Sequence, residues 1–423
     1  MQILESLKIK EKIYMEKLEN GLTVMIVPKN NTNKKYVIWG THFGSNDNHF
    51  IVPGTGEEVQ VPDGVAHYLE HKMFEQENGK NSLDVLMSLG VDANAYTTNN
   101  HTAYLFETID HFYEALDELM DYVQHPYFTD ENVEKERGII GQEIGMYDDD
   151  PGWRLYMNAL DCMYKKNAIK IDIAGTVESI AKIDKEVLYK CYNTFYHPSN
   201  MLLVICGDFK PEEILEEVKK RLVEKPKQGE IKVIHPDDEN EEINMPYKEE
   251  KMEVSKPLFM IGFKDEIGES DKVKRHIAVE ILMNMLIGKS SDTYQKLYKD
   301  GIILAQPELD YEFANGYSHV LISGQTTNPE KLKEELLKAI RKNIENFDEE
   351  HFVRIKKKVY GDYVMEYNNV SDIARMLLSD YFKGVNSFDY IEEYNTVTSE
   401  YTKEILKEVF DENKCIMSVV KTK

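Results

Sequence analysis

ETIDHFYEALDELMDYVQHPYFTDENVEKERGIIGQEI, residues 107–144, has a counterpart with the same pattern of elements in the second half of the chain. The counterpart reads GQTTNPEKLKEELLKAIRKNIENFDEEHFVRIKKKVYGDYV and spans residues 324–364. Aligning Phe128 with Phe347 brings the two stretches into register, and each is typical of a strand end, a helix, a turn and a second helix. One repeat with a period of about 215 residues predicts two similar domains and excludes a solenoid of short units.

The rest of the chain supports this division. LENGLTVMIVP in the first half and KPLFMIGF in the second are matching early strands. Strands alternate with long amphipathic helices at 211–223, 330–346 and 400–410, which indicates layered sheets covered by helices. We expect two domains, 1–228 and 229–423, with the charged, proline-bearing stretch 224–251 as the linker between them.

Composition narrows the class of protein. The chain has 423 residues and a net charge of −25, which argues against nucleic acid as a partner. The acidic residues could attract basic peptides, or could simply form a solvated surface. We expect no membrane span, because no run of 18 apolar residues occurs. The N-terminus lacks a secretory signal pattern, and the four cysteines lack C-x-x-C spacing, so we expect a cytoplasmic location.

Residues 67–71, His-Tyr-Leu-Glu-His, form the motif that carries chemistry. On a helix, His67, Glu70 and His71 lie at roughly 0°, −60° and +40°, so all three share one face. A catalytic zinc site needs three protein ligands and an open position. The two imidazoles provide two ligands, which leaves Glu70 free to act as a base.

A second predicted helix, 130–146, provides the missing ligand. Glu136 and Glu143 are seven residues apart and therefore lie on one face, two turns apart. Since this helix also has an apolar side for packing, a carboxylate there needs a partner. We predict Glu143 as the third zinc ligand and Glu136 as the group that orients a ligand or the substrate.

Three segments in this order resemble the pitrilysin/insulinase family of zinc metallopeptidases, the inverzincins: PDGVAHYLEHKMFE, DANAYTTNNHTAYLFET and NVEKERGIIGQEI. The resemblance covers essentially the whole chain. It implies an α+β fold of two similar domains, each a mainly antiparallel sheet covered by helices, which together form half of a peptide chamber. It also implies zinc ligands and a general base, here His67, His71, Glu143 and Glu70.

The resemblance further implies that Asn94 and Ala95 lie on an edge strand that receives the substrate peptide. Residues 92–107 alternate and are rich in Thr, Tyr and Phe, as a strand or hairpin would be. An unpaired edge can hydrogen-bond any peptide backbone, which suits an enzyme with many substrates. An ordinary sheet strand would have the same pattern.

One feature departs from the family pattern. Family members typically carry an Arg and a Tyr, seven residues apart, that stabilise the oxyanion. In the matching segment, 293–306, Tyr298 replaces the Arg, and Leu304 or Ala305 replaces the Tyr. Because one oxyanion donor is commonly worth about 10² to 10³ in rate, we expect a second chain to provide the pair.

The sequence therefore predicts a zinc-dependent endopeptidase that cleaves unfolded peptides or short segments. We expect a homodimer, or a heterodimer with a related chain that carries the Arg/Tyr pair. The alternative is a non-proteolytic or partner-dependent subunit of a peptidase or maturation complex. The base at Glu70 argues for catalysis, whereas the missing pair argues for the alternative.

Overall fold

The computed structural model describes residues 1–423 except 236–238, 240–241, 267 and 269–270. The chain forms two compact units, each discontinuous in sequence. The first contains Met1–Ile144, Ile171–His235 and Met365–Phe388, and the second contains Gly145–Lys170, Pro236–Val364 and Asp389–Lys423. Each unit thus includes a segment from the other half of the sequence. The division into 1–228 and 229–423 stays a prediction about the duplicated halves.

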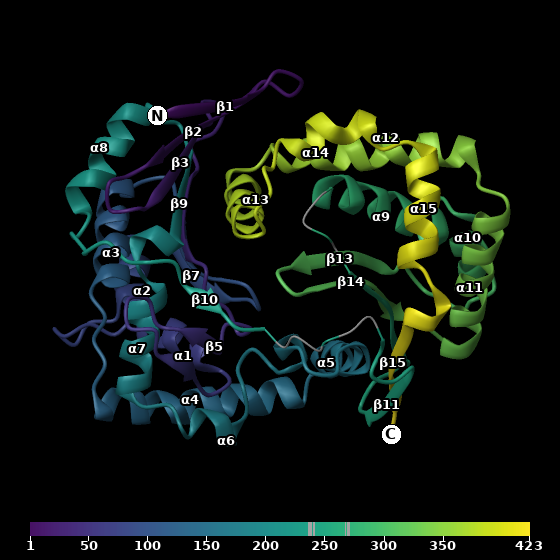
Figure 1. Ribbon diagram of the computed structural model, residues 1–423, viewed down its shortest axis with the longest axis horizontal. Helices are drawn as coiled ribbons and strands as arrows, with labels where there is room; N and C mark the ends of the chain where they lie inside the picture. The colour runs from purple at the N-terminus through teal and green to yellow at the C-terminus, as the bar shows by residue number, and fades with distance from the viewer. Residues whose placement is uncertain (236–238, 240–241, 267, 269–270) are drawn as a thin grey trace. The chain divides into compact units, whose positions relative to one another are not determined.

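The first unit is built on a seven-stranded sheet with the order β1-β2-β3-β9-β4-β8-β7 (Figure 1). All neighbours are antiparallel except β3 and β9. The strands are β1 Gln2–Ser6, β2 Glu11–Lys17, β3 Thr23–Pro28, β4 Lys35–Thr41, β7 Asp92–Thr97, β8 Thr102–Thr108 and β9 Met201–Gly207. A smaller sheet consists of β5 His49–Ile51, β6 Glu58–Gln60 and β10 Lys232–Val233.

Helices cover both faces of the large sheet. Strand β9, Met-Leu-Leu-Val-Ile-Cys-Gly, is buried along its whole length, as expected for a central strand with apolar residues on both sides. Helix α13 packs against β4 and β9. It approaches so closely that a Cβ atom at Gly40 would lie 2.7 Å from the Leu378 side chain. The helices are α1 Val65–Lys72, α2 Ser82–Ser88, α3 Phe112–Gln124, α4 Asp130–Asp148, α6 Val177–Ile180, α7 Lys185–Phe195, α8 Pro211–Arg221 and α13 Val370–Phe382.

The second unit has a five-stranded sheet with the order β11-β15-β12-β14-β13. Only β11 and β15 are parallel neighbours. The strands are β11 Tyr247–Met252, β12 Leu258–Asp265, β13 Glu308–Ala314, β14 Tyr317–Gln325 and β15 Cys415–Thr422. The helices are α5 Pro151–Met163, α9 Lys272–Ile287, α10 Asp292–Lys299, α11 Pro329–Glu345, α12 Glu349–Glu366, α14 Asp389–Glu392 and α15 Ser399–Val409.

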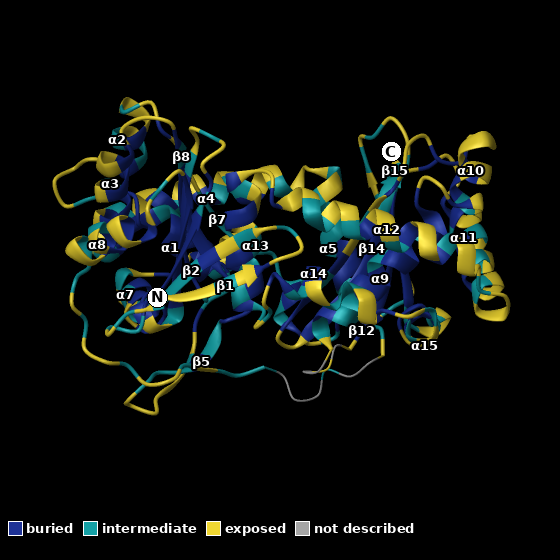
Figure 2. Cartoon of the chain, turned by 90° about the horizontal axis from the view of Figure 1, so that it is seen from above, coloured by how far each residue is buried: buried dark blue, intermediate teal, exposed yellow. Residues whose placement is uncertain are grey.

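The predicted α+β class with two similar, antiparallel-rich domains is confirmed. In the first unit the hairpin β7–β8 is followed by α3 and α4, and in the second the hairpin β13–β14 is followed by α11 and α12. In both units, buried residues concentrate on the sheets and on the inner faces of the helices (Figure 2).

The predicted linker contains secondary structure. The predicted linker, 224–251, includes β10 and most of β11, and residues 236–238 and 240–241 of it lie outside the described residues.

Across the described part of the chain, no helix combines the length and apolar composition needed to span a bilayer. The four cysteines are buried and unbridged. The cytoplasmic location stays a prediction.

Candidate metal centre

Helix α1 carries the His-Tyr-Leu-Glu-His motif and is fixed at its start and along its length. It begins after Gly64, whose φ of +90° favours glycine and whose added Cβ would lie 2.4 Å from the Ala174 carbonyl oxygen. The buried Tyr68 hydroxyl donates a hydrogen bond to the Val133 carbonyl of α4. This bond connects α1 to the helix that carries Glu136 and Glu143.

Helix α4 itself begins with a reciprocal cap, in which Thr129 and Asn132 each accept a hydrogen bond from the other's backbone N–H.

The structure brings together the three predicted metal ligands. One donor atom from each of His67, His71 and Glu143 lies within 4.8 Å of the other two. The Nε2 atoms of His67 and His71 are 3.6 Å and 3.4 Å from the two carboxylate oxygens of Glu143. Among the described residues, no other group of three His, Cys, Asp or Glu side chains has this geometry.

These residues fit a zinc ion. Two imidazole nitrogens and one carboxylate are a known ligand set of catalytic zinc, with the fourth position open. The Nε2 atom of His67 faces Glu143, and the Nδ1 atom of the same ring is buried without a hydrogen-bond partner. The Nδ1 atom of His71 is 3.1 Å from Glu136 Oε1, the arrangement that orients a ligating imidazole. Burial lowers the pKa of His71, but Glu136, Glu70 and Glu143 together raise it above its ordinary value.

A buried lysine that sequence reasoning missed lies beside the pair formed by His71 and Glu136. Lys72 has no exposed side-chain surface; its ammonium forms an ion pair with Glu75 and lies 3.8 Å from Glu136 Oε2. The i,i+3 spacing of Lys72 and Glu75 was a signal in the sequence, but the approach of Glu136 from α4 depends on tertiary structure. Lys72 balances the charge of the carboxylate that holds His71.

Replacing this lysine should weaken the site. We expect Lys72→Met to destabilise the metal-free chain by about 1–3 kcal/mol, because Glu136 and Glu75 lose a buried partner. Zinc affinity should fall by about tenfold as His71 loses its fixed orientation. Urea unfolding and zinc titration measure the two effects. Lys135→Met is the matched control, since Lys135 also pairs with Glu75 but is exposed. Equal unfolding midpoints for the two variants would contradict the role given to Lys72.

Glu70 lies on the side of α1 that faces the end of β7. Its side chain is buried, and its Oε2 atom accepts a 2.6 Å hydrogen bond from the Thr97 hydroxyl. Burial raises the pKa of Glu70, while His67 and Thr97 oppose the rise. A carboxyl group with a raised pKa is better matched to proton transfer near neutral pH. Sequence reasoning missed Thr97, although its place two residues after Ala95 puts it on the same face of the strand.

The two predicted substrate residues lie on the edge of the sheet. Strand β7 pairs with β8 on one side, and it is the last strand in the sheet order. Asn94 is exposed, and its side-chain oxygen accepts a hydrogen bond from the Ala95 N–H. The strand leads directly into Thr97, so the edge and Glu70 are adjacent.

Two arginines of the second unit, Arg275 and Arg341, are engaged elsewhere and do not replace the missing Arg. Tyr298 and Leu304 are both exposed, at 53% and 38%. Arg275 is bound by Asp265 through two hydrogen bonds, of 2.7 Å and 3.0 Å, and by Glu408. Arg341 is bound by Glu412. Both arginines are thus engaged in structural ion pairs.

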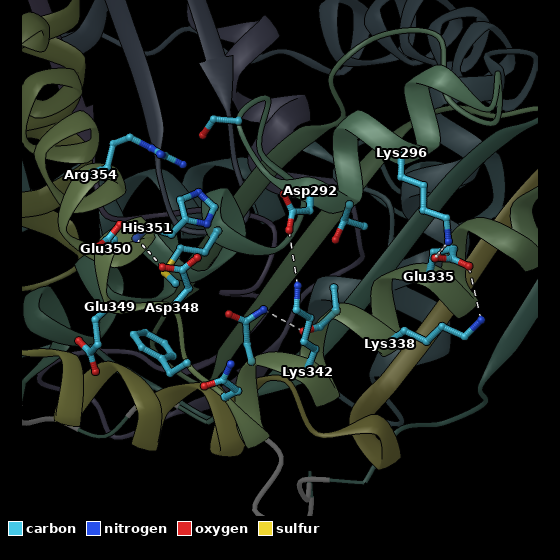
Figure 3. Close-up of a pocket in the computed structure, with 17 residues that line it drawn as sticks. Asp292, Lys296, Glu335, Lys338, Lys342, Asp348, Glu349, Glu350, His351 and Arg354 are labelled. Carbon is cyan, nitrogen blue, oxygen red and sulfur yellow. Dashed lines mark hydrogen bonds and ion pairs between the residues drawn. The ribbon is translucent and has the colours of Figure 1, made fainter.

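The second unit also has a cavity of about 860 Å³, lined by α10, α11 and α12 (Figure 3). Its charged side chains largely neutralise one another: Glu335 lies between Lys296 and Lys338, and Asp292 faces Lys342. It contains none of the predicted site residues.

A duplicated α+β fold with an inverted zinc-peptidase motif on one helix and a glutamate on a second defines the inverzincin class of metallopeptidases. Residues 50–177 match the family profile described as insulinase, peptidase family M16, and residues 182–359 match the profile described as the peptidase M16 inactive domain. The chain therefore belongs to the insulinase (M16) family of peptidases.

Individual relatives agree with this assignment. An "uncharacterized zinc protease YmfH" from Bacillus subtilis is 39% identical over 95% of this chain and 94% of its own length. The crystal structure of a putative M16-like peptidase from Alicyclobacillus acidocaldarius is 33% identical and has a TM-score of 0.93 over 99% of this chain and 100% of that chain. Pitrilysin, at 16% identity, shares the fold with a TM-score of 0.76 over 100% of this chain and 46% of its own.

Proposed function

We propose that this chain is a zinc-dependent endopeptidase that hydrolyses unfolded peptides or short segments. The main support is the convergence of His67, His71 and Glu143 beside a buried Glu70 that is hydrogen-bonded to the end of an edge strand. A structural metal site has no use for a buried carboxylate placed in this way. The zinc-protease names of its relatives add to the proposal.

His67 and His71, through Nε2, and Glu143 would hold the metal. Bound Zn²⁺ supplies Lewis acidity, which polarises the scissile carbonyl and lowers the pKa of water. Glu136 keeps the His71 ring in position through its Nδ1 atom.

Glu70 is the general base and then the general acid. Its Oε2 atom is held by Thr97, so the carboxylate has one fixed orientation. In the first step the carboxylate accepts a proton from the attacking water. In the second it donates that proton to the amine of the departing peptide, which returns Glu70 to its starting state.

The substrate binds as a strand added to β7. Asn94 and Ala95 lie on this edge strand, and strand addition needs no particular substrate sequence. Because β7 ends at Thr97, a peptide paired with it passes close to Glu70.

A partner-dependent role is the second candidate, and the absence of the Arg/Tyr pair from 293–306 favours it. A homodimer or a heterodimer with a related chain would provide the pair. A related protein from Arabidopsis thaliana, 28% identical over 40% of this chain, is described as a probable mitochondrial-processing peptidase subunit beta.

Cleavage of a quenched fluorescent peptide library tests the proposal. The purified chain should cleave the library, a chelator should stop cleavage, and added zinc should restore it. Light scattering on the same sample gives the oligomeric state. No cleavage by a zinc-loaded chain would reject a self-sufficient peptidase. Cleavage that appears only after a related Arg/Tyr-bearing chain is added would establish the partner-dependent form.

A further inference from the structure

An arginine that contacts two tyrosine rings lies close to the edge strand β7. Arg375 is exposed and lies on α13, the helix that covers β4 and β9. Its guanidinium carbon is 5.2 Å from the centre of the Tyr96 ring on β7 and 5.9 Å from that of Tyr36 on β4. The two aromatic rings hold the guanidinium over the outer part of the sheet.

Among the described residues, Arg375 forms no ion pair with a carboxylate, and its guanidinium lies against the rings of the two tyrosines. Burial raises the pKa of both phenols to about 12, so both are neutral near pH 7. The chain has 76 acidic and 51 basic residues, and most of its other arginines form ion pairs. Arg375 therefore presents to solvent a guanidinium that has no ion-pair partner, on the same sheet face as Glu107 and Asp92.

The sheet register places this charge on one side of the substrate edge. Gly40, Ala103 and Tyr96 are paired across β4, β8 and β7, so they lie on the same face, and α13 covers that face at Gly40. Asn94 shares the face because it is two residues from Tyr96. Thr97 lies on the opposite face, where it contacts Glu70.

A peptide strand paired with β7 would lie about 4.8 Å beyond it, with side chains directed alternately to the two faces. Residues that point toward the Thr97 face would lie near Glu70. Residues that point the other way would pass the Tyr96 ring and reach the guanidinium of Arg375.

We propose that Arg375 binds a carboxylate of the substrate, and so selects peptides with an acidic residue on the face of the added strand that points away from Glu70. This inference rests on the proposed function, because it needs peptides to bind along β7. An internal Asp or Glu and the carboxylate at a peptide's C-terminus offer the same chemistry. A guanidinium held on two rings can donate two parallel hydrogen bonds to either carboxylate.

The test compares matched peptides that differ at one position, Glu against Gln, with the substitution moved along the sequence. Binding is measured by anisotropy with the zinc-loaded Glu70→Gln variant, and kcat/KM is measured with the parent enzyme. We expect Glu to be favoured about 3- to 10-fold, at one or two positions that alternate along the peptide. Free-acid and amidated peptides separate the C-terminal carboxylate from an internal one.

Variants of the arginine make the test specific. Arg375→Gln should bring the Glu/Gln ratio to about one, Arg375→Glu should favour Lys at the same position, and Arg375→Lys should keep part of the preference. Lys182→Gln, which removes another exposed charge from the first unit, should leave the ratio as in the parent.

Two failures can be told apart. If the parent cleaves peptides but the Glu/Gln ratio is one everywhere, or Arg375→Gln keeps the ratio, the role of Arg375 is wrong and the endopeptidase stands. If the parent neither binds nor cleaves any peptide, the proposed function fails and the role of Arg375 with it.

Discussion

The Glu70→Gln substitution is expected to lower peptide turnover by about 10²- to 10⁴-fold, the range that a general base contributes. The amide has nearly the shape of the carboxylate, and its oxygen can still accept the Thr97 hydrogen bond. It cannot take the proton from water. Zinc content should stay at one per chain, because Glu70 is not among the three converging ligands. Peptide cleavage assays measure the turnover, and metal analysis of the same preparation measures the zinc content.

The same variant has an expected effect on stability. Burial raises the pKa of Glu70 in the folded chain. Above that pKa the folded chain contains an ionised, buried carboxylate, which lowers its stability, and this loss of stability disappears as the pH falls through the pKa. The metal-free Glu70→Gln protein should thus be no less stable than the parent at neutral pH. Glu77→Gln, an exposed residue after the same helix, is the control for activity. Loss of zinc, or retained turnover, in Glu70→Gln would contradict the assignment.

Removal of the third ligand, Glu143, should cause loss of zinc, whereas Glu70→Gln should keep it. We expect Glu143→Ala to weaken zinc binding by more than about 100-fold, beyond the 10- to 100-fold typical of groups that only orient a ligand. His67 and His71 remain, but two imidazoles on one helix cannot enclose the ion. Zinc titration against a competing chelator gives the affinity, and turnover should fall in proportion to bound zinc.

Two other glutamates of α4 form a graded control. Glu136 contacts His71 but not the centre of the cluster, so Glu136→Gln should reduce zinc affinity by about 10- to 100-fold. Glu131 is exposed in the first turn of the helix, and Glu131→Ala should behave as the parent. A chain that keeps stoichiometric zinc after Glu143→Ala would require another third ligand.

The sequence predicted that the candidate site residues lie close together, because their key spacings are local. His67, Glu70 and His71 share a face of one helix turn, and Glu136 and Glu143 share a face of another, so helical geometry alone groups them. Thr97 and Lys72 were missed for a different reason. Each acts through a contact with a residue more than twenty positions away, Glu70 or Glu136, and no short spacing reveals such a contact.

The fold was predictable from its repeat but its compact units were not. The helix pairs α3–α4 and α11–α12 follow from the matching stretches 107–144 and 324–364. The exchange of Met365–Phe388 and Gly145–Lys170 between the units has no counterpart in the repeat. Amphipathic periodicity predicts that α13 buries one face, but it does not identify the sheet that this face covers.

The position of α13 limits how the protein can be divided. Its buried residues Ile373, Leu377, Leu378 and Phe382 form part of the core of the first unit, and the burial of each stabilises that unit by about 1.5–3 kcal/mol. A fragment that ends at residue 228 would lack this cover and expose the apolar face of β4 and β9 to solvent. The metal-binding half therefore depends on a helix encoded more than 140 residues after it ends. A gene split between the two halves would encode α13 apart from the sheet that it covers, so the half with the candidate metal centre would need this helix from the other chain in order to fold.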